Sequence, residues 1–198
     1  MYDVLITGLL GMAQILVQLL ALYLAADLLG GVFHWAEDTL GHPDSRFWGK
    51  IFVQPNEIHH ERPSAMIQIP WLKNNVPILI ATLSVVGIAV LLDVVTWQLL
   101  VFAGFAGLNQ QVHRFSHAPR QRLPGAVKWL QKAGVLQDAR HHWKHHTTPH
   151  LTHYCVLTPW LNPILDRVGF WRGMERLFVP VFGAPRRADL KAYGWYRD

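Results

Sequence analysis

Residues 141–150, which read HHWKHHTTPH, place five histidines in ten consecutive positions. Neutral imidazole is a common ligand of transition metals, and its pKa near neutrality also suits pH sensing. The only cysteine, Cys155, excludes a cysteine-rich metal site and an internal disulfide framework. Any metal chemistry must therefore come from histidine and carboxylate side chains.

Pairs of potential ligands recur at a separation of four residues, which on a helix puts both side chains on one face. These pairs are His34 with Asp38, His113 with His117, His141 with His145, and His142 with His146. Because successive helical residues lie about 100° apart, a helical segment 141–146 would present a broad face of four imidazoles. Adjacent His59 and His60 would add ligands from a loop or a helix end. Eight or more candidates imply two ions, since a single structural zinc needs only four ligands.

Each element of this pattern alone has a simpler explanation. His34 and Asp38 could be a hydrogen-bonded pair at a helix end, and HHWKHH could be a metal-sequestering tract, a pH sensor or a solvated helix. Bis-histidine haem ligation is a further possibility for His34 or His113. Isolated His42 and His153 are expected to be surface or turn residues. The joint occurrence of several pairs favours a metal centre, and many imidazoles with few carboxylates suit iron, zinc or copper.

The segments that must position these ligands are apolar enough for a membrane. Hydrophobic residues make up 51% of the chain and charged residues only 16%. The apolar tract 4–32 exceeds the roughly 20 residues that span hydrocarbon. A second apolar tract, 76–108, is predicted to turn near Asp93. It is too long for a single crossing and would form most of two short or tilted crossings, 76–92 and 94–112. We predict an all-α integral membrane protein with about three transmembrane crossings and a histidine-rich helical cap, in one domain of residues 1–198.

The basic residues define an orientation in the membrane. All 18 Lys and Arg residues lie either between residues 46 and 73 or from residue 114 onward. The positive-inside rule makes those segments cytoplasmic, and all twelve histidines fall on the same side. The net charge of +5 and the pI near 9.6 suit contact with anionic lipid headgroups. No nucleic-acid recognition motif accompanies this charge, so we expect no nucleic-acid partner.

Six segments resemble, in order and spacing, the lipid desaturase family. They are HWAEDTLG (34–41), NEIHHERP (56–63), NQQVHRFSH (109–117), LQKAGVLQDARHHWKHHTTPH (130–150), YCVLTPWLNPILD (154–166) and FWRGME (170–175). The family contains plasmanylethanolamine desaturases, bacterial light-response regulators of carotenoid synthesis and plant chloroplast palmitate desaturases. The resemblance implies a dinuclear iron centre at His34, Asp38, His59, His60, His113, His117, His142, His145, His146 and His150, with His141 matching some members.

The resemblance also implies a reaction, in which two iron ions use O₂ as co-substrate to desaturate a membrane lipid. The chain has no nucleotide-binding fingerprint such as GxGxxG, so electrons must come from a separate donor of cytochrome b5 or ferredoxin type. Arg114 and Lys144 are predicted to attract the phosphate of the phospholipid substrate. We expect the protein to lie in a bacterial inner membrane with its histidine-rich face in the cytoplasm.

Two features of the sequence favour different substrates. The segment 154–175 and the PRRADLKAY tail resemble plasmalogen-forming members, which favours conversion of plasmanylethanolamine, an alkyl-ether phospholipid, to a vinyl-ether plasmalogen. Those members tend to carry a His-Asp pair where this chain has Gln68 and Ile69. Plant palmitate desaturases lack that pair too, so acyl-chain desaturation is an alternative. A di-iron lipid hydroxylase and a non-catalytic metal-binding membrane protein are further alternatives.

The segment WLNPILDRVGFW (160–171) is predicted to form an amphipathic helix at the membrane interface. Trp160, Trp171 and Trp195 fit an aromatic belt in this interpretation. Ordinary packing in a protein core explains the same tryptophans equally well.

Overall fold

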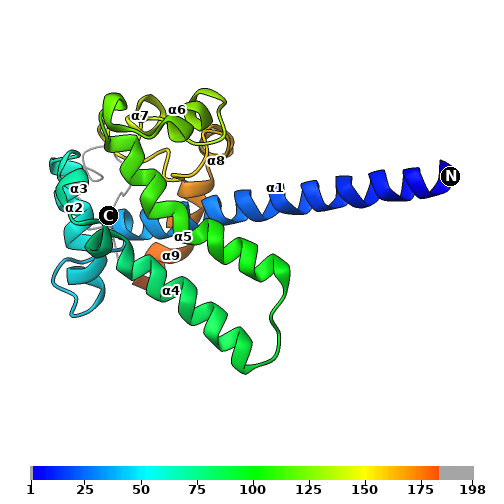
Figure 1. Cartoon of the computed structure of the whole chain (residues 1–198). Coiled ribbons are helices and arrows are strands. Elements are labelled where there is room, and N and C mark those ends of the chain that lie inside the picture. The colour runs from blue at the N-terminus through cyan, green and yellow to red at the C-terminus, as the bar shows by residue number, and fades with distance from the viewer. Residues whose placement is uncertain (1, 183–198) are drawn as a thin grey trace.

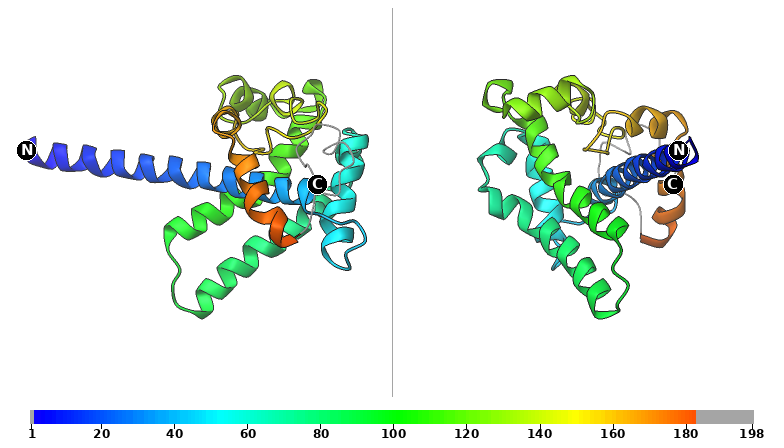
Figure 2. Two further views of the ribbon diagram at one scale, coloured as in Figure 1. Left: turned by 180° about the vertical axis from the view of Figure 1, so that it is seen from behind. Right: turned by 45° about the vertical axis from the view of Figure 1, so that its right-hand side comes forward.

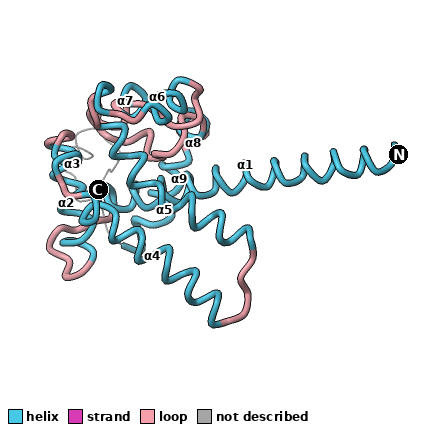
Figure 3. Tube along the Cα trace, in the orientation of Figure 1, coloured by secondary structure: helices cyan, strands magenta, loops and turns pink. Residues whose placement is uncertain are grey.

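A computed structural model describes residues 2–182, which consist of helices and loops without any strand (Figures 1 and 3). This confirms the predicted all-α class for the described part of the chain. Three long helices, α1 (Tyr2–Thr39), α4 (Trp71–Leu91) and α5 (Trp97–His117), carry a cap of short ones. The cap consists of η1 (Gly49–Val53), α2 (Gln54–Glu61), α3 (Ala65–Gln68), η2 (Arg120–Arg122), α6 (Gly125–Lys132), α7 (Ala139–His142), α8 (Leu161–Arg167) and α9 (Phe170–Phe182).

Helix α1 is continuous over 38 residues, which corresponds to a length of about 57 Å at 1.5 Å per residue. Its N-terminal half projects away from the rest of the chain in Figure 1 and in the left view of Figure 2, with exposed side chains such as Leu9, Leu16 and Val17. Its C-terminal half packs against α5 and continues beyond the predicted end of the first crossing at residue 32. One unbroken helix therefore connects the apolar N-terminal region to His34 and Asp38.

Two of the described helices are long and apolar enough to cross a membrane, Leu5–Thr39 and Trp71–Leu91. The sequence predicted about three crossings. The third corresponds to α5, which is antiparallel to α4 but is not one of these two helices, so a third crossing stays a prediction. The turn lies where it was predicted, since Asp93 after α4 adopts a left-handed backbone conformation with φ of 54°. Thr96 caps the next helix by accepting a hydrogen bond of 3.2 Å from Leu99 N.

Two adjacent glycines allow α1 to approach its neighbours closely. A Cβ atom on Gly30 would lie 2.1 Å from Asn109 Oδ1, and one on Gly31 would lie 2.6 Å from Cys155 Sγ. The loop 154–158 is held in this position by the buried Asp27 carboxylate. That group accepts hydrogen bonds from the backbone N of residues 157 and 158, at 2.7 and 3.0 Å, and from the Thr158 hydroxyl. The loop after the last histidine is thereby fixed against α1.

The segment predicted as one interfacial helix is divided between α8 and α9, because Gly169 takes a left-handed conformation with φ of 67°. Trp171 is buried, and its ring centroid lies 4.8 Å from that of Tyr154, so core packing is the correct explanation for this tryptophan. Trp160 is 41% exposed. Trp195 and the PRRADLKAY tail lie outside the described residues.

Candidate metal centre

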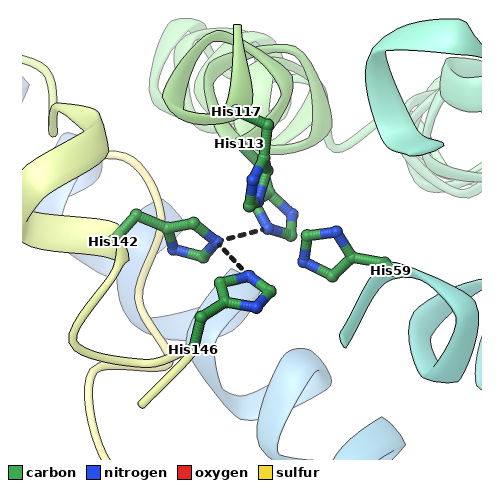
Figure 4. Close-up of side chains that lie close together, drawn as sticks. All are labelled: His59, His113, His117, His142 and His146. Carbon is green, nitrogen blue, oxygen red and sulfur yellow. Dashed lines mark hydrogen bonds between the residues drawn. The ribbon is translucent and has the colours of Figure 1, made fainter. Parts of the chain in front are cut away.

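Nine of the predicted ligands converge at the end of α5 opposite the α4–α5 turn. They form two sets, and in each set one ligand atom from every residue lies within 4.8 Å of all the others. The five-histidine set consists of His59, His113, His117, His142 and His146 (Figure 4). The four-residue set consists of His34, Asp38, His60 and His145.

Four segments that are distant in sequence supply these side chains. Helix α1 contributes the pair at 34 and 38 to the four-residue set, and α5 contributes the pair at 113 and 117 to the five-histidine set. Helix α2 contributes one adjacent histidine to each set, His59 and His60. Residues 142–146 supply the remaining three. The i, i+4 spacing therefore places both members of each helical pair in the same set.

The segment HHWKHH differs from the predicted helix. Helix α7 ends at His142, and residues 143–146 form turns. His142 and His146 still meet in the five-histidine set, but His145 joins the four-residue set. His141 lies in neither set: its Nε2 is 3.2 Å from Asn162 Nδ2, and its ring centroid is 5.1 Å from that of His153. The expected face of four imidazoles does not form, because α7 ends at His142 and does not continue to His146.

The nitrogen atoms of the five-histidine set are spaced as metal ligands are. His142 Nε2 lies 2.9 Å from His113 Nε2 and 3.1 Å from His146 Nε2. A neutral imidazole nitrogen carries either one proton or one lone pair, so it cannot serve both neighbours well by hydrogen bonding. Two ligands about 2.1 Å from one ion and at right angles would be about 3.0 Å apart. The spacing fits a shared cation.

Unsatisfied nitrogen atoms support the same conclusion. Among the described residues, neither ring nitrogen of buried His59 has a hydrogen-bond partner. A buried polar atom without a partner costs free energy, of the order of 1–3 kcal/mol. A metal ion in the five-histidine set would satisfy one nitrogen of this ring.

Hydrogen bonds to the outer ring nitrogens orient the four-residue set. His34 Nδ1 lies 3.1 Å from the carbonyl oxygen of Tyr154, and His145 Nδ1 lies 2.8 Å from that of Thr152. A carbonyl can only accept, so both Nδ1 atoms carry the proton and both Nε2 lone pairs face the set. This arrangement is typical of metal-bound histidine.

Asp38 is the single carboxylate in the two sets. Its Oδ1 accepts a hydrogen bond of 2.5 Å from Asn56 Nδ2, and it lies 3.0 Å from His60 Nε2. Its Oδ2 lies 3.4 Å from His145 Nε2. The carboxylate is thus positioned to ligate an ion or to orient the imidazoles around one.

Burial favours the neutral form of several of these imidazoles. Desolvation lowers the pKa values of His59, His142 and His145 well below the ordinary range, and neighbouring imidazoles lower them further, although Asp38 partly opposes this at His145. The pKa of His146 falls to about 2, mainly through burial and then through His60 and His117. Neutral imidazoles offer lone pairs, so the sets are suited to bind cations at neutral pH.

Four other residues singled out in the sequence lie outside the two sets. His150 Nδ1 is 3.0 Å from the carbonyl oxygen of His145, and its ring centroid lies 4.9 Å from that of His60. Arg114 donates to the carbonyl oxygens of residues 67 and 69, at 2.9 and 2.6 Å. Lys144 and His42 are exposed. Arg114 therefore anchors the C-terminal end of α3 beside the ligands of α5.

Sequence reasoning missed two supporting residues. Asn56 holds Asp38, and the Gln137 amide lies 3.4 Å from His142 Nδ1. Both are buried amides within the recognised segments, directly upstream of histidine ligands. Their position in the sequence could have drawn attention to them, but only the fold shows which imidazole or carboxylate each one contacts.

Comparison with known proteins gives a consistent result. The sequence profile of the lipid desaturase domain matches residues 23–189. The chain is 34% identical over 178 residues to plasmanylethanolamine desaturase 1 of Mus musculus, covering 84% of this chain and 65% of the relative. It is 31% identical over 178 residues to the plasmanylethanolamine desaturase of Myxococcus xanthus, covering 86% and 63%. A probable fatty acid desaturase of Acanthamoeba polyphaga mimivirus is 29% identical over 182 residues, covering 92% and 90%.

The chain therefore spans slightly less than two thirds of the length of the two plasmanylethanolamine desaturases. No solved structure matches it significantly.

Proposed function

The chain belongs to the lipid desaturase family, and from this membership we propose that it is an O₂-dependent di-iron desaturase of membrane lipids. The observation that carries the proposal is the presence of two adjoining, buried donor sets in which imidazole predominates. The sets adjoin closely: the ring centroids of His60 and His146 are 5.0 Å apart, and those of His34 and His113 are 5.3 Å apart. Two sets are what a dinuclear centre requires.

The five-histidine set would hold one iron ion and the four-residue set the other, with His150 and His141 as neighbours rather than ligands. When bound, the ions would supply the activation of O₂ and the removal of hydrogen from an unactivated carbon. The chain itself supplies neutral, oriented imidazoles and one carboxylate. Tyr154, which is buried with its ring centroid 5.8 Å from that of His34, helps to keep water away from the four-residue set, and the buried Trp35 belongs to the same core cluster as Tyr154.

The long helices provide a route for the lipid. Helices α1 and α5 both run from an apolar, exposed region to the donor sets, where His34 and His113 lie next to each other. A hydrocarbon chain that lies along the outside of these two packed helices would bring one of its carbons toward the sets. Together with the two apolar helices, this arrangement supports association with a membrane. A bacterial inner membrane, with the cap in the cytoplasm and an external electron donor, is part of this proposal.

We propose an alkyl-ether phospholipid as the substrate, converted to a vinyl-ether plasmalogen by loss of two hydrogens next to the ether oxygen. The names of the relatives in Mus musculus and Myxococcus xanthus support this choice. Two guanidinium nitrogens of Arg114 donate to the backbone, and its remaining N–H groups stay part of the proposal as donors to the lipid phosphate.

Acyl-chain desaturation is the second candidate, because one observation favours it. Gln68 and Ile69 replace the His-Asp pair of plasmalogen-forming members, and Arg114 holds the backbone on either side of Gln68. The replaced pair therefore lies in a segment that is hydrogen-bonded to the residue that follows the ligand His113. The name of the mimiviral relative is consistent with this candidate.

Lipid analysis would separate these functions. The chain would be expressed in a host that lacks plasmalogens and is supplied with alkyl-ether lipid, and the lipids would be examined by mass spectrometry. We expect an acid-labile vinyl ether that is two hydrogens lighter than its precursor. Unchanged ether lipids with newly unsaturated acyl chains would select the second candidate, and a gain of one oxygen would indicate hydroxylation. Metal loading without O₂ consumption would refute the enzymatic proposal.

A further inference from the structure

One aromatic side chain links the five-histidine set to the surface. The indole of Trp143 is 58% exposed. Its ring stacks on that of His146, with centroids 5.9 Å apart and an interplanar angle of 26°. His146 Nε2 in turn lies 3.1 Å from His142 Nε2 inside the set. An exposed ring is therefore in direct contact with a candidate metal ligand.

The surface around Trp143 is strongly basic. The segment 118–150 carries six Lys and Arg residues and a single acidic one, Asp138, whose carboxylate accepts a hydrogen bond of 2.8 Å from His141 N. The six cations are Arg120, Arg122, Lys128, Lys132, Arg140 and Lys144. Arg140 and Lys144 line one surface pocket of about 290 Å³ together with Gln131 of α6 and Asp138. We define the cationic face by Arg140 of α7 and by Trp143 and Lys144 in the turn that follows it.

This face is directed away from the apolar helices. In Figure 1, α6 and α7 lie beyond the end of α5 that is opposite the α4–α5 turn, and far from the N-terminus of α1. The most exposed apolar side chains of α1, such as Leu9, Leu10 and Leu16, belong to the half of that helix that projects away from α6 and α7. A protein partner from the aqueous phase can therefore reach the cationic face more easily than a lipid headgroup can.

We propose that this face docks an acidic one-electron carrier protein, whose electrons enter the centre at Trp143 and His146. Charge complementarity selects such a partner and speeds encounter, and electron-transfer complexes need only a small interface. The inference rests on the proposed desaturase function. For each lipid molecule, two carriers dock in turn, and each is oxidised as it gives up one electron. These two electrons, two hydrogens from adjacent carbons of the lipid and two protons from water together reduce O₂ to two water molecules.

Binding measurements test the docking step independently of activity. Iron-loaded protein in neutral phosphatidylcholine nanodiscs would be titrated with a plant-type [2Fe–2S] ferredoxin and with the soluble haem domain of cytochrome b5, with the basic cytochrome c as a control carrier. We expect Arg140→Glu/Lys144→Glu to weaken binding of an acidic carrier on the order of tenfold at low salt, and less at high salt. The matched double reversal Lys73→Glu/Arg176→Glu, on exposed residues of α4 and α9, should leave binding unchanged.

Reduction kinetics test the point of entry. Trp143→Ala should slow reduction of the centre by the bound carrier at least tenfold, whereas reduction by dithionite should be unchanged. Trp160→Ala, at another exposed tryptophan, should slow neither. Iron content confirms that both variants keep the centre.

Three outcomes would overturn the docking proposal. In the first, neither acidic carrier binds more tightly than cytochrome c. In the second, the two double reversals have equal effects on carrier binding. In the third, Arg140→Glu/Lys144→Glu weakens binding to anionic vesicles but not to the carriers. The last would assign the face to a membrane surface. Product formation with dithionite would show that the desaturase proposal survives such a failure. Absence of product with either reductant would instead refute the desaturase proposal.

Discussion

The two donor sets lie side by side but differ in charge. The five-histidine set offers only imidazole, whereas the four-residue set combines three imidazoles with the Asp38 carboxylate. A carboxylate is a harder ligand than imidazole and brings a negative charge, so an ion in the four-residue set would be partly neutralised. The two ions would therefore differ in affinity and in reduction potential, although they share one cap.

The sets also differ in their support from the fold. Two imidazoles of the four-residue set are fixed by backbone carbonyls, at Tyr154 and Thr152. In the five-histidine set, His142 has the side chain of Gln137 at its outer nitrogen, and no hydrogen-bond partner is described for His59. The four-residue set is thus preorganised by the fold, while the five-histidine set depends more on the ion itself. Substitutions at four residues test this difference.

The largest effect should come from His142→Ala. This residue contacts both His113 and His146 within the five-histidine set. Its removal should reduce bound iron from about two ions to about one per chain, and desaturation should fall at least about 100-fold. Elemental analysis and the lipid assay measure the two quantities. His42→Ala, at an exposed histidine outside both sets, is the matched control and should change neither. Retention of both ions would contradict the assignment of this set.

Asp38→Asn should affect the opposite set. Asparagine preserves the shape and one oxygen for the bond from Asn56 but removes the negative charge. We expect the four-residue set to bind iron about 10- to 100-fold more weakly, while the five-histidine set stays filled. Mössbauer spectroscopy of the half-loaded protein distinguishes the two environments. Asp44→Asn, at an exposed carboxylate, should have no effect. Equal loss from both sets would mean that they do not bind independently.

Gly31→Ala tests the packing that supports the four-residue set. The added Cβ would lie 2.6 Å from Cys155 Sγ and 3.1 Å from Cys155 N, so the loop that carries the Tyr154 carbonyl must move. We expect a loss of about 1–3 kcal/mol in stability, together with weaker iron binding at His34. Gly11→Ala on the same helix meets nothing within 4 Å and should be neutral or slightly stabilising. Thermal unfolding in detergent compares the two variants, and equal melting temperatures would count against the close approach of α1.

Sequence reasoning was most successful where long helices carry the ligands. The pairs 34/38 and 113/117 meet as their spacing requires, because α1 and α5 stay helical through both members. The pair at 141 and 145 fails, because α7 ends at His142 and the turns after it rotate His145 toward α1. The division of His59 and His60 between two sets depends on where α2 packs. No local pattern determines that, so the sequence predicted two ions but not their ligand sets.

The smallest effect, and the most specific, is expected at Gln137. Its amide lies 3.4 Å from His142 Nδ1, and its own Oε1 has no partner among the described residues. The oxygen and nitrogen of a side-chain amide have nearly the same shape, so either one can face His142. With the oxygen toward His142, the amide would accept a hydrogen bond from His142 Nδ1–H. The Nε2 lone pair of His142 would then be available to an ion. Gln137→Leu should therefore weaken iron binding to the five-histidine set by about tenfold and leave the four-residue set unchanged.

The conservative variant Gln137→Glu decides whether this contact orients the imidazole or merely fills space. A carboxylate is a stronger acceptor for the Nδ1 proton, so it should restore iron affinity at the five-histidine set, whereas a packing role would predict no recovery from a buried charge. Iron titration followed by optical spectroscopy measures both variants, with Gln121→Leu at an exposed glutamine as the control. If leucine and glutamate were equally damaging, Gln137 would not support the set. The five histidines would then be held by the ion and the packing of their helices alone, and the contrast with the four-residue set would be larger.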